Sequence, residues 1–186
     1  MNVDTHEISD EQLATRAQDG DAEAFGALVD RYEQKLLRYG TKFLARSEDI
    51  EDIVQDVFLS AYRSIQGFDV SLRFSPWIYR IAHNAFVNAL RKREREPIFL
   101  DFDTLLSHET HDDSHVSEQE RREVREMLDR GLTRLPPKYR EVLVLHYFED
   151  MAYKDIADVL HVPLGTVSVR IRRAKEMLKQ QLQNNI

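Results

Sequence analysis

The sequence contains no cysteine, and only six glycines and five prolines occur among its 186 residues. Without cysteine, disulfides, thiol catalysis, iron–sulfur clusters and cysteine-ligated zinc are all excluded. So little glycine and proline argues against a β-rich fold with many tight turns. No apolar run approaches the roughly 18 residues of a membrane-spanning helix, and the polar, acidic first residues do not resemble a secretory leader. We therefore expect a soluble, helical, cytoplasmic chain with no membrane span.

Sequence signatures of catalysis are also missing. The chain has no GxxxxGK[ST] phosphate loop, no GxGxxG, no HExxH and no GxSxG. Three histidines, His108, His111 and His115, lie close together among acidic residues. Incidental composition of a polar segment explains them better than a metal site does. The sequence thus predicts no enzyme, no cofactor and no metal.

Charge is distributed unevenly along the chain. The whole sequence carries a net charge of −7, and residues 1–30 and 101–120 each carry −7 by themselves. By contrast, residues 73–95 carry +5 and residues 163–179 carry +4. Because local potential rather than net charge governs phosphate binding, two basic segments separated by an acidic one favour a nucleic-acid partner. Ordinary solvated helix faces are the alternative for either segment alone.

Apolar residues recur with helical period over most of the chain. Helix starts are indicated at Asp21, at Ser47, at Ser75 with Pro76, and after the pair Pro136-Pro137. The sequence predicts an all-α fold in which two small helical domains are joined by a flexible acidic linker. We expect an acidic tail over 1–19, a first domain over 20–96, the linker over 97–117, and a second domain over 118–186 that contains a helix-turn-helix.

The helix-turn-helix is predicted near the C-terminus, where a short helix over 153–160 and a turn over 161–163 precede a longer helix. Apolar residues form the inner stripe of that longer helix, and a cationic face points the opposite way. Its candidate contacts are Ser168, Val169, Arg170, Arg172, Arg173 and Lys175. A second helix presenting such a face suits the major groove of duplex DNA. A plain helical hairpin with a solvated basic face is the alternative.

A second polar stripe follows one side of the helix predicted over 76–95. It consists of Arg80, Asn84, Asn88, Arg91 and Arg95, and the aromatic residues Phe68, Phe74, Trp77 and Tyr79 lie near the helix start. Arginine and amide side chains beside aromatic rings suit backbone contacts and stacking of unpaired bases. Packing in the core is the usual alternative for such aromatic residues.

The helix predicted over 48–66 has an acidic outer face. Its members are Glu48, Asp52, Gln55 and Asp56, with the apolar Leu59 beside them. Dense carboxylates repel DNA, so this face indicates a basic protein partner. A solvated face favoured by the helix dipole is the alternative.

Three segments together resemble a known family. They are DIVQDVF at 52–58, FSPWIYRIAHN at 74–84 and VPLGTV at 162–167. In order and spacing they are similar to bacterial sigma factors of the extracytoplasmic-function (ECF) type. The resemblance covers about 20–96 and 118–182.

The resemblance implies an initiation factor that binds core RNA polymerase and directs promoter-specific transcription. The implied partners are promoter DNA, the β′ clamp helices and the β flap of the polymerase, and an anti-sigma protein. The polymerase contacts would be Asp52, Gln55, Asp56 and Leu59. Melting and capture of the −10 element would involve the loop 68–74 together with Phe74, Trp77, Arg80, Asn84, Asn88 and Arg91. Recognition of the −35 element would involve Ser168, Val169, Arg170, Arg172, Arg173 and Lys175.

One departure from the family concerns Ser168 and Val169, which stand where members often carry a basic residue, so no −35 preference is carried over. Two other functions compete with a sigma factor. A stand-alone helix-turn-helix regulator would leave the acidic face unexplained. A sigma mimic that binds only an anti-sigma protein would not need the cluster Arg170, Arg172 and Arg173.

Overall fold

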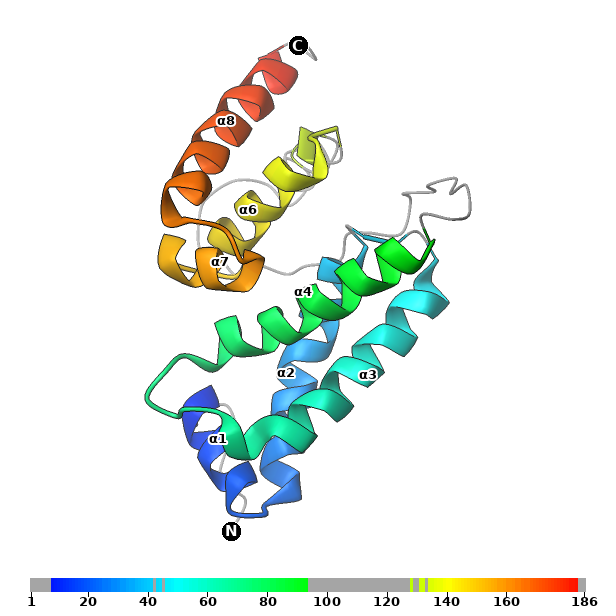
Figure 1. Ribbon diagram of the computed structural model, residues 1–186, viewed down its shortest axis with the longest axis vertical. Coiled ribbons are helices and arrows are strands. Elements are labelled where there is room, and N and C mark those ends of the chain that lie inside the picture. The colour runs from blue at the N-terminus through cyan, green and yellow to red at the C-terminus, as the bar shows by residue number, and fades with distance from the viewer. Residues whose placement is uncertain are drawn as a thin grey trace, which may run out of the picture. The chain divides into compact units, whose positions relative to one another are not determined.

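The computed structural model describes residues 8–41, 43–44, 46–93, 128, 131–132 and 134–183. Within this part of the chain, the regular structure is entirely helical, which confirms the predicted all-α fold. The helices form two compact units, one built from α1–α4 and the other from α6–α8 (Figure 1). No helix among these residues is long and apolar enough to cross a membrane. The predicted linker and its three histidines lie outside the described residues.

The described residues of the first unit form four α-helices and one short 3-10 helix. They are α1 (Asp10–Gln18), α2 (Ala22–Gly40), α3 (Ser47–Ser64), η1 (Ile65–Gly67) and α4 (Phe74–Arg93). Helix α2 begins as predicted, because the Asp21 carboxylate accepts a hydrogen bond from the Ala24 amide at 3.1 Å. Helix α3 has Arg46 in the N-cap position and no side-chain cap, so Ser47 is its first residue rather than its cap. Acidic residues in that first turn favour the start through the helix dipole.

The prediction of a tail over 1–19 is wrong for Asp10–Gln18, which form α1. Ser9 caps this helix through a capping box with Gln12. One face of α1 buries Leu13, Ala14 and Ala17. The acidity of the segment concealed this short amphipathic helix, whose apolar stripe contains only one large side chain.

Aromatic side chains fill much of the core of the first unit. Tyr39 lies edge-on to Tyr79 and to Phe86, with ring centroids 5.2 and 6.2 Å away. Gly40 is required where α2 passes Phe86, because a Cβ there would lie 2.5 Å from that ring. Ile78 and Ala82 of α4 lie in this core together with Tyr79 and Phe86, and all four are fully buried.

The second unit contains α6 (Pro137–Tyr147), α7 (Tyr153–Leu160) and α8 (Leu164–Gln183). Helix α6 begins at the predicted proline pair, with Pro137 in the first turn, where its missing amide costs nothing. Between α7 and α8, His161 adopts a left-handed conformation with φ of 52° and turns the chain. Ile156 on α7 and Val167 and Ile171 on α8 are buried. This arrangement is a helix-turn-helix.

Candidate nucleic-acid and protein interfaces

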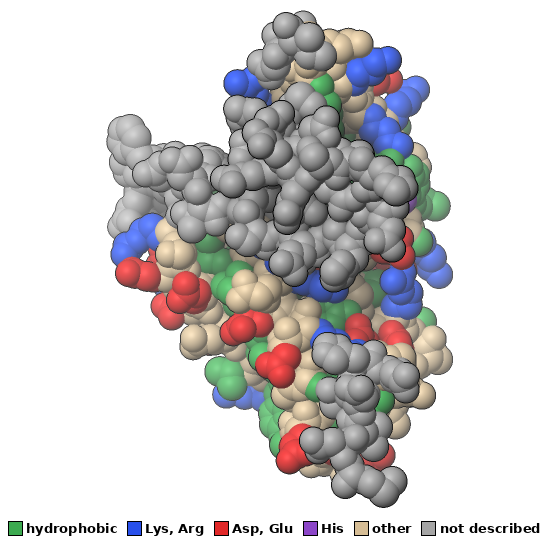
Figure 2. Space-filling model, turned by 180° about the vertical axis from the view of Figure 1, so that it is seen from behind, with side chains coloured by type: hydrophobic (Ala, Val, Ile, Leu, Met, Phe, Trp, Pro, Cys, Tyr) green, Lys and Arg blue, Asp and Glu red, His purple; other side chains and the backbone are tan. Residues whose placement is uncertain are grey.

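The outer face of α8 is basic and exposed. Ser168, Val169, Arg172, Arg173 and Lys175 are exposed, and Arg170 is half-buried. The opposite stripe of Val167, Ile171 and Ala174 is buried, so helical periodicity separates the two faces. In the second unit, Lys and Arg side chains gather along the side on which α8 lies (Figure 2). The structure therefore brings the six predicted residues of this helix together on or beside one surface.

Two tyrosines of α6 lie beside this basic face, and sequence reasoning missed both. A hydrogen bond from Arg173 lowers the pKa of Tyr139, as do the nearby charges of Lys138 and Arg170. On Tyr147, the Lys175 ammonium lies 5.0 Å from the ring centroid, and its hydrogen bond to the hydroxyl raises the pKa of Lys175. Two tyrosines of α6 therefore lie beside cations of α8.

The polar stripe of α4 is only partly available to a ligand. Arg80, Asn84 and Asn88 are exposed at a spacing of four residues, which places them along one side of the helix. Trp77 is half-buried. The side chain of Arg91 lies outside the described residues.

Phe74 does not meet its prediction as a DNA contact, because only 1% of it is exposed. Its ring lies edge-on to Tyr32 and Phe68, with centroids 5.4 and 5.5 Å away. Tyr79 is fully buried. The ring of Trp77 packs against that of Phe68, with the two centroids 5.1 Å apart. The alternative interpretation of the aromatic residues as core is therefore correct for most of them, with Trp77 at the edge.

The loop 68–73 connects η1 to α4 and has a defined turn. The Asp69 carboxylate accepts hydrogen bonds from the Ser71 amide at 3.0 Å and the Ser71 hydroxyl at 2.7 Å, which lower the pKa of Asp69. Beyond this turn Leu72 is 60% exposed, and Val70 is 38% exposed. The sequence indicated the loop but gave no reason to single out these two apolar side chains, since periodicity does not apply to a loop.

The outer face of α3 presents the four predicted polymerase contacts to solvent. Asp52, Gln55 and Asp56 are exposed, and Leu59 is 53% exposed. Asp and Glu side chains gather on the side of the first unit along which α3 lies (Figure 2).

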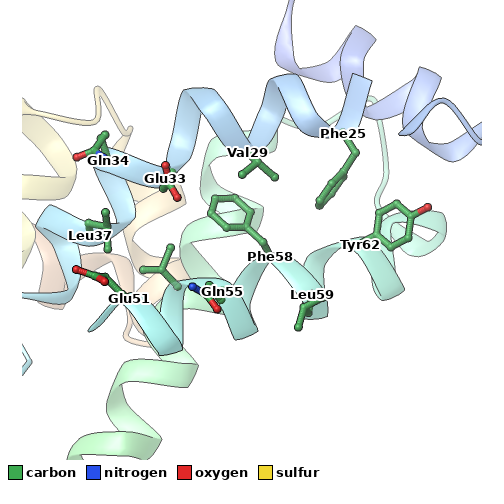
Figure 3. A pocket seen from close by; sticks show the side chains of 11 residues that line it. Phe25, Val29, Glu33, Gln34, Leu37, Glu51, Gln55, Phe58, Leu59 and Tyr62 are labelled. Carbon is green, nitrogen blue, oxygen red and sulfur yellow. The ribbon is translucent and has the colours of Figure 1, made fainter. Parts of the chain in front are cut away.

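An open groove of about 690 Å³ runs between α2 and α3 beside this acidic face (Figure 3). Its lining is mainly apolar and consists of Phe25, Val29, Glu33, Gln34, Leu37, Glu51, Val54, Gln55, Phe58, Leu59 and Tyr62. The rings of Phe25 and Tyr62 meet edge-on at 5.0 Å. Sequence reasoning found Gln55 and Leu59 but missed the contribution of α2, because the groove depends on how the two helices pack.

Comparison with known proteins decides the family. The family model for sigma-70 region 2 matches residues 28–96, and the one for sigma-70 region 4 matches residues 125–178. An ECF RNA polymerase sigma factor of Bacillus subtilis, SigW, is 34% identical over 177 residues, which cover 89% of this chain and 92% of that protein. The chain belongs to the ECF RNA polymerase sigma factors. A second relative of this sigma factor, the ECF sigma-E factor of Haemophilus influenzae, is 35% identical and covers 95% of the chain and 97% of its own length.

Solved structures agree with this assignment. The structure of CnrH in complex with the cytosolic domain of CnrY covers 96% of this sigma factor and 100% of that chain, with a TM-score of 0.68 and 27% identity. The sigma factor RpoE of Bartonella quintana, solved with the anti-sigma factor NepR, shares the fold with a TM-score of 0.60 and 22% identity over 81% of this chain and 91% of its own.

Family membership establishes what the protein does. It is a sigma factor that directs RNA polymerase to promoters, and sigma factors are initiation factors without a catalytic role. Among the residues that the structure describes, no group of three or more His, Asp or Glu side chains is placed to hold a metal ion.

Proposed function

We propose that this ECF sigma factor divides promoter recognition between its two units. Helix α3 docks on the β′ clamp helices of core RNA polymerase, the loop 68–73 with α4 melts and holds the −10 element, and α8 reads the −35 element as duplex. The protein acts in the cytoplasm and catalyses no reaction itself. The observation that supports this proposal most directly is that α3 and α8 bury similar apolar stripes but expose faces of opposite charge.

Docking through α3 follows from charge and from exposed apolar surface. Asp52 and Asp56 lie one helical turn apart on the exposed side. Their negative charge disfavours DNA and favours a basic protein surface. Leu59, at 53% exposure, adds an apolar contact at the edge of the α2–α3 groove.

Duplex recognition through α8 follows from its arginines. A guanidinium can donate two hydrogen bonds to a guanine edge or to a phosphate, and a helix fits the major groove. Exposed Arg172 is the base-reading candidate, whereas Arg173 also bonds Tyr139, which suits a fixed phosphate contact. Val169, 41% exposed, offers an apolar contact for a thymine methyl group.

Capture of the −10 element is assigned to the loop and to the exposed stripe of α4. Asn84 and Asn88 supply amide groups for base edges, and Arg80 supplies a positive charge for phosphate. Val70 and Leu72 give the loop an apolar surface against which an unstacked base can pack. Trp77 borders this region, while Phe74 supports it from the core.

Two further partners belong to the proposal. CnrH, 27% identical, was solved with the cytosolic domain of CnrY. We assign an anti-sigma protein to the exposed apolar groove between α2 and α3 of this chain. The β flap of the polymerase is assigned to the second unit, where Phe148 is 53% exposed.

The experiment is in-vitro transcription with purified bacterial core polymerase on a pool of genomic promoter fragments, with and without the protein. We expect start sites that appear only with the protein, and their upstream sequences should align into two elements. Failure to bind core polymerase would favour a stand-alone regulator. Core binding without transcripts from any fragment, together with no binding to promoter DNA, would favour a sigma mimic.

A further inference from the structure

Helix α1 holds both ends of the loop that we assign to the −10 element. At the start of the loop, the Gln18 side-chain amide donates hydrogen bonds to the carbonyls of Ile65 at 2.7 Å and Phe68 at 2.8 Å. At the end of the loop, the Phe74 amide donates to the Glu11 carboxylate at 3.0 Å. Gln18 and Glu11 lie at opposite ends of α1, so one helix spans the loop.

These contacts add hydrogen-bond partners to backbone groups at the ends of helices. The Ile65 carbonyl, at the first residue of η1, also accepts from the Phe68 amide at 3.0 Å. The Phe68 carbonyl follows the end of η1, and the Phe74 amide is the first of α4. Helix ends leave such groups without intrahelical bonds, and a carboxylate at a helix N-terminus is also favoured by the dipole. Because all the groups are part-buried, water replaces these partners poorly.

Helix α1 is itself anchored to the rest of the unit. The Asp10 carboxylate bonds the Arg31 guanidinium at 2.6 Å and the Tyr32 hydroxyl at 2.5 Å, both on α2. The Gln66 side chain donates to the Gln18 carbonyl at 2.6 Å and is a second tie between α1 and η1. Helix α1 is therefore hydrogen-bonded both to α2 and to the two ends of the loop.

We propose that Gln18 and Glu11 are positioning residues for promoter opening: they fix the spacing of the loop 68–73 so that Val70 and Leu72 meet the unpaired −10 strand. The inference rests on the proposed function of this loop. Helix α1 lies N-terminal to the residues that match the region 2 family model, so that match does not include it. A preorganised loop avoids the entropy cost of ordering on binding, which is where the effect arises.

The test substitutes Gln18→Glu, which keeps the size of the side chain but removes both donors and places a carboxylate against two carbonyl oxygens. The matched control is Gln12→Glu on the same helix, whose carboxylate can still accept from the Ser9 amide. Glu11→Ala removes the second tie, and Glu11→Gln restores an acceptor for the Phe74 amide. All variants are made in the full chain and assembled into holoenzyme.

The measurement is open-complex formation, followed by 2-aminopurine fluorescence in the −10 element of a promoter recovered by the transcription assay. We expect Gln18→Glu to reduce open-complex formation about tenfold and Glu11→Ala about threefold, on the scale of lost part-buried hydrogen bonds. Glu11→Gln and Gln12→Glu should stay near the parent, and core-polymerase affinity should not change. In the free protein, hydrogen exchange at residues 69–74 should be faster in Gln18→Glu than in the parent. In Gln12→Glu, these residues should exchange at the parent rate.

Equal open-complex formation by Gln18→Glu and Gln12→Glu would overturn the inference. If Asn84→Ala impaired opening in the same assay, the −10 assignment would survive and only the role of α1 would fall. If Asn84→Ala and Arg80→Ala were also without effect, the proposed function of this region would fall as well. If Gln18→Glu lost core-polymerase affinity by the same factor as open-complex formation, the inference would also be overturned. Such a result would show a general structural role for Gln18.

Discussion

Helices α3 and α8 have similar lengths, 18 and 20 residues, and both bury a stripe of branched apolar side chains. Their exposed sides differ completely. Helix α3 presents Asp52 and Asp56 beside Leu59, whereas α8 presents Arg172 and Arg173 beside Val169. Since the inner faces are alike, packing alone would not distinguish the two helices. The outer charges differ in sign, and we infer that they select different partners.

The comparison also shows why a net charge is a poor guide to partners. The chain is acidic overall, with a net charge of −7. A phosphate backbone meets only the local potential, which falls off over roughly 10 Å at moderate salt. An acidic protein can therefore bind DNA through α8 and a basic protein surface through α3.

The largest effect is expected when the charge of α3 is reversed. The double variant Asp52→Lys and Asp56→Lys should abolish binding to core polymerase, because it places two cations against a basic partner. Binding of duplex promoter DNA through α8 should remain. The measurement is core-polymerase affinity by fluorescence anisotropy of the labelled full chain, with promoter-duplex binding measured in parallel.

The matched control is Glu23→Lys with Asp30→Lys, two exposed acids on α2. This pair changes the net charge of the protein by the same amount without altering the α3 face. If both double variants lost core binding equally, overall charge rather than the α3 surface would explain the effect, and the contrast between the two helices would disappear.

A smaller effect is expected on the basic side of the comparison. Arg172→Ala should weaken −35 binding by about 1–3 kcal/mol and change base preference if the guanidinium reads a base edge. Arg173→Ala should weaken all sequences uniformly, since its bond to Tyr139 suits a phosphate contact. The measurement is the affinity of each variant for a set of single-base variants of the −35 duplex.

Lys179→Ala serves as the control, because Lys179 is an exposed cation farther along α8 and outside the predicted contacts. A uniform loss for Arg172→Ala would reassign Arg172 to phosphate. A change of base preference for Arg173→Ala would exchange the two roles.

Sequence periodicity predicted most of the architecture, because apolar stripes and caps are local properties. The start at Asp21, the proline start of α6 and the inner stripe of α8 all agree with the structure. Helix α1 was missed because its apolar stripe is short, and its stability comes from contacts such as Asp10 with Arg31 on another helix. Local pattern cannot report such contacts.

The candidate site was predictable to a similar extent. Exposed charges on α3 and α8 follow from helical phase, so the sequence placed them correctly. Phe74 was assigned to DNA but is buried against Tyr32, because an aromatic at a helix start can turn either way and tertiary packing decides. The α2–α3 groove and Tyr139 beside Arg173 depend on helices that meet only after folding.

The smallest expected effect is a difference between the two units in how their stability depends on pH. Tyr32 in the first unit is 2% exposed, and burial with its hydrogen bond to Asp10 raises its pKa well above 10.0. The unfolded chain releases this proton near pH 10, whereas the folded unit retains it. The contribution of Tyr32 to the free energy of unfolding is therefore fully present below pH 10. It decreases above pH 10, by at most about 1.4 kcal/mol per pH unit. Tyr139 in the second unit has a lowered pKa and contributes with the opposite sign.

Trp77, the sole tryptophan, lies in the first unit and reports its unfolding by fluorescence. Urea titrations of the full chain between pH 8 and about pH 11 should show the unfolding free energy falling above pH 10. Tyr32→Phe should lower the stability of the first unit at pH 8 by about 1 kcal/mol and flatten its alkaline decline. Tyr139→Phe, which changes the other unit, should leave the unfolding reported by Trp77 unchanged. An alkaline decline of equal slope in Tyr32→Phe would show that other groups cause it, and the contrast between the tyrosines of the two units would be lost.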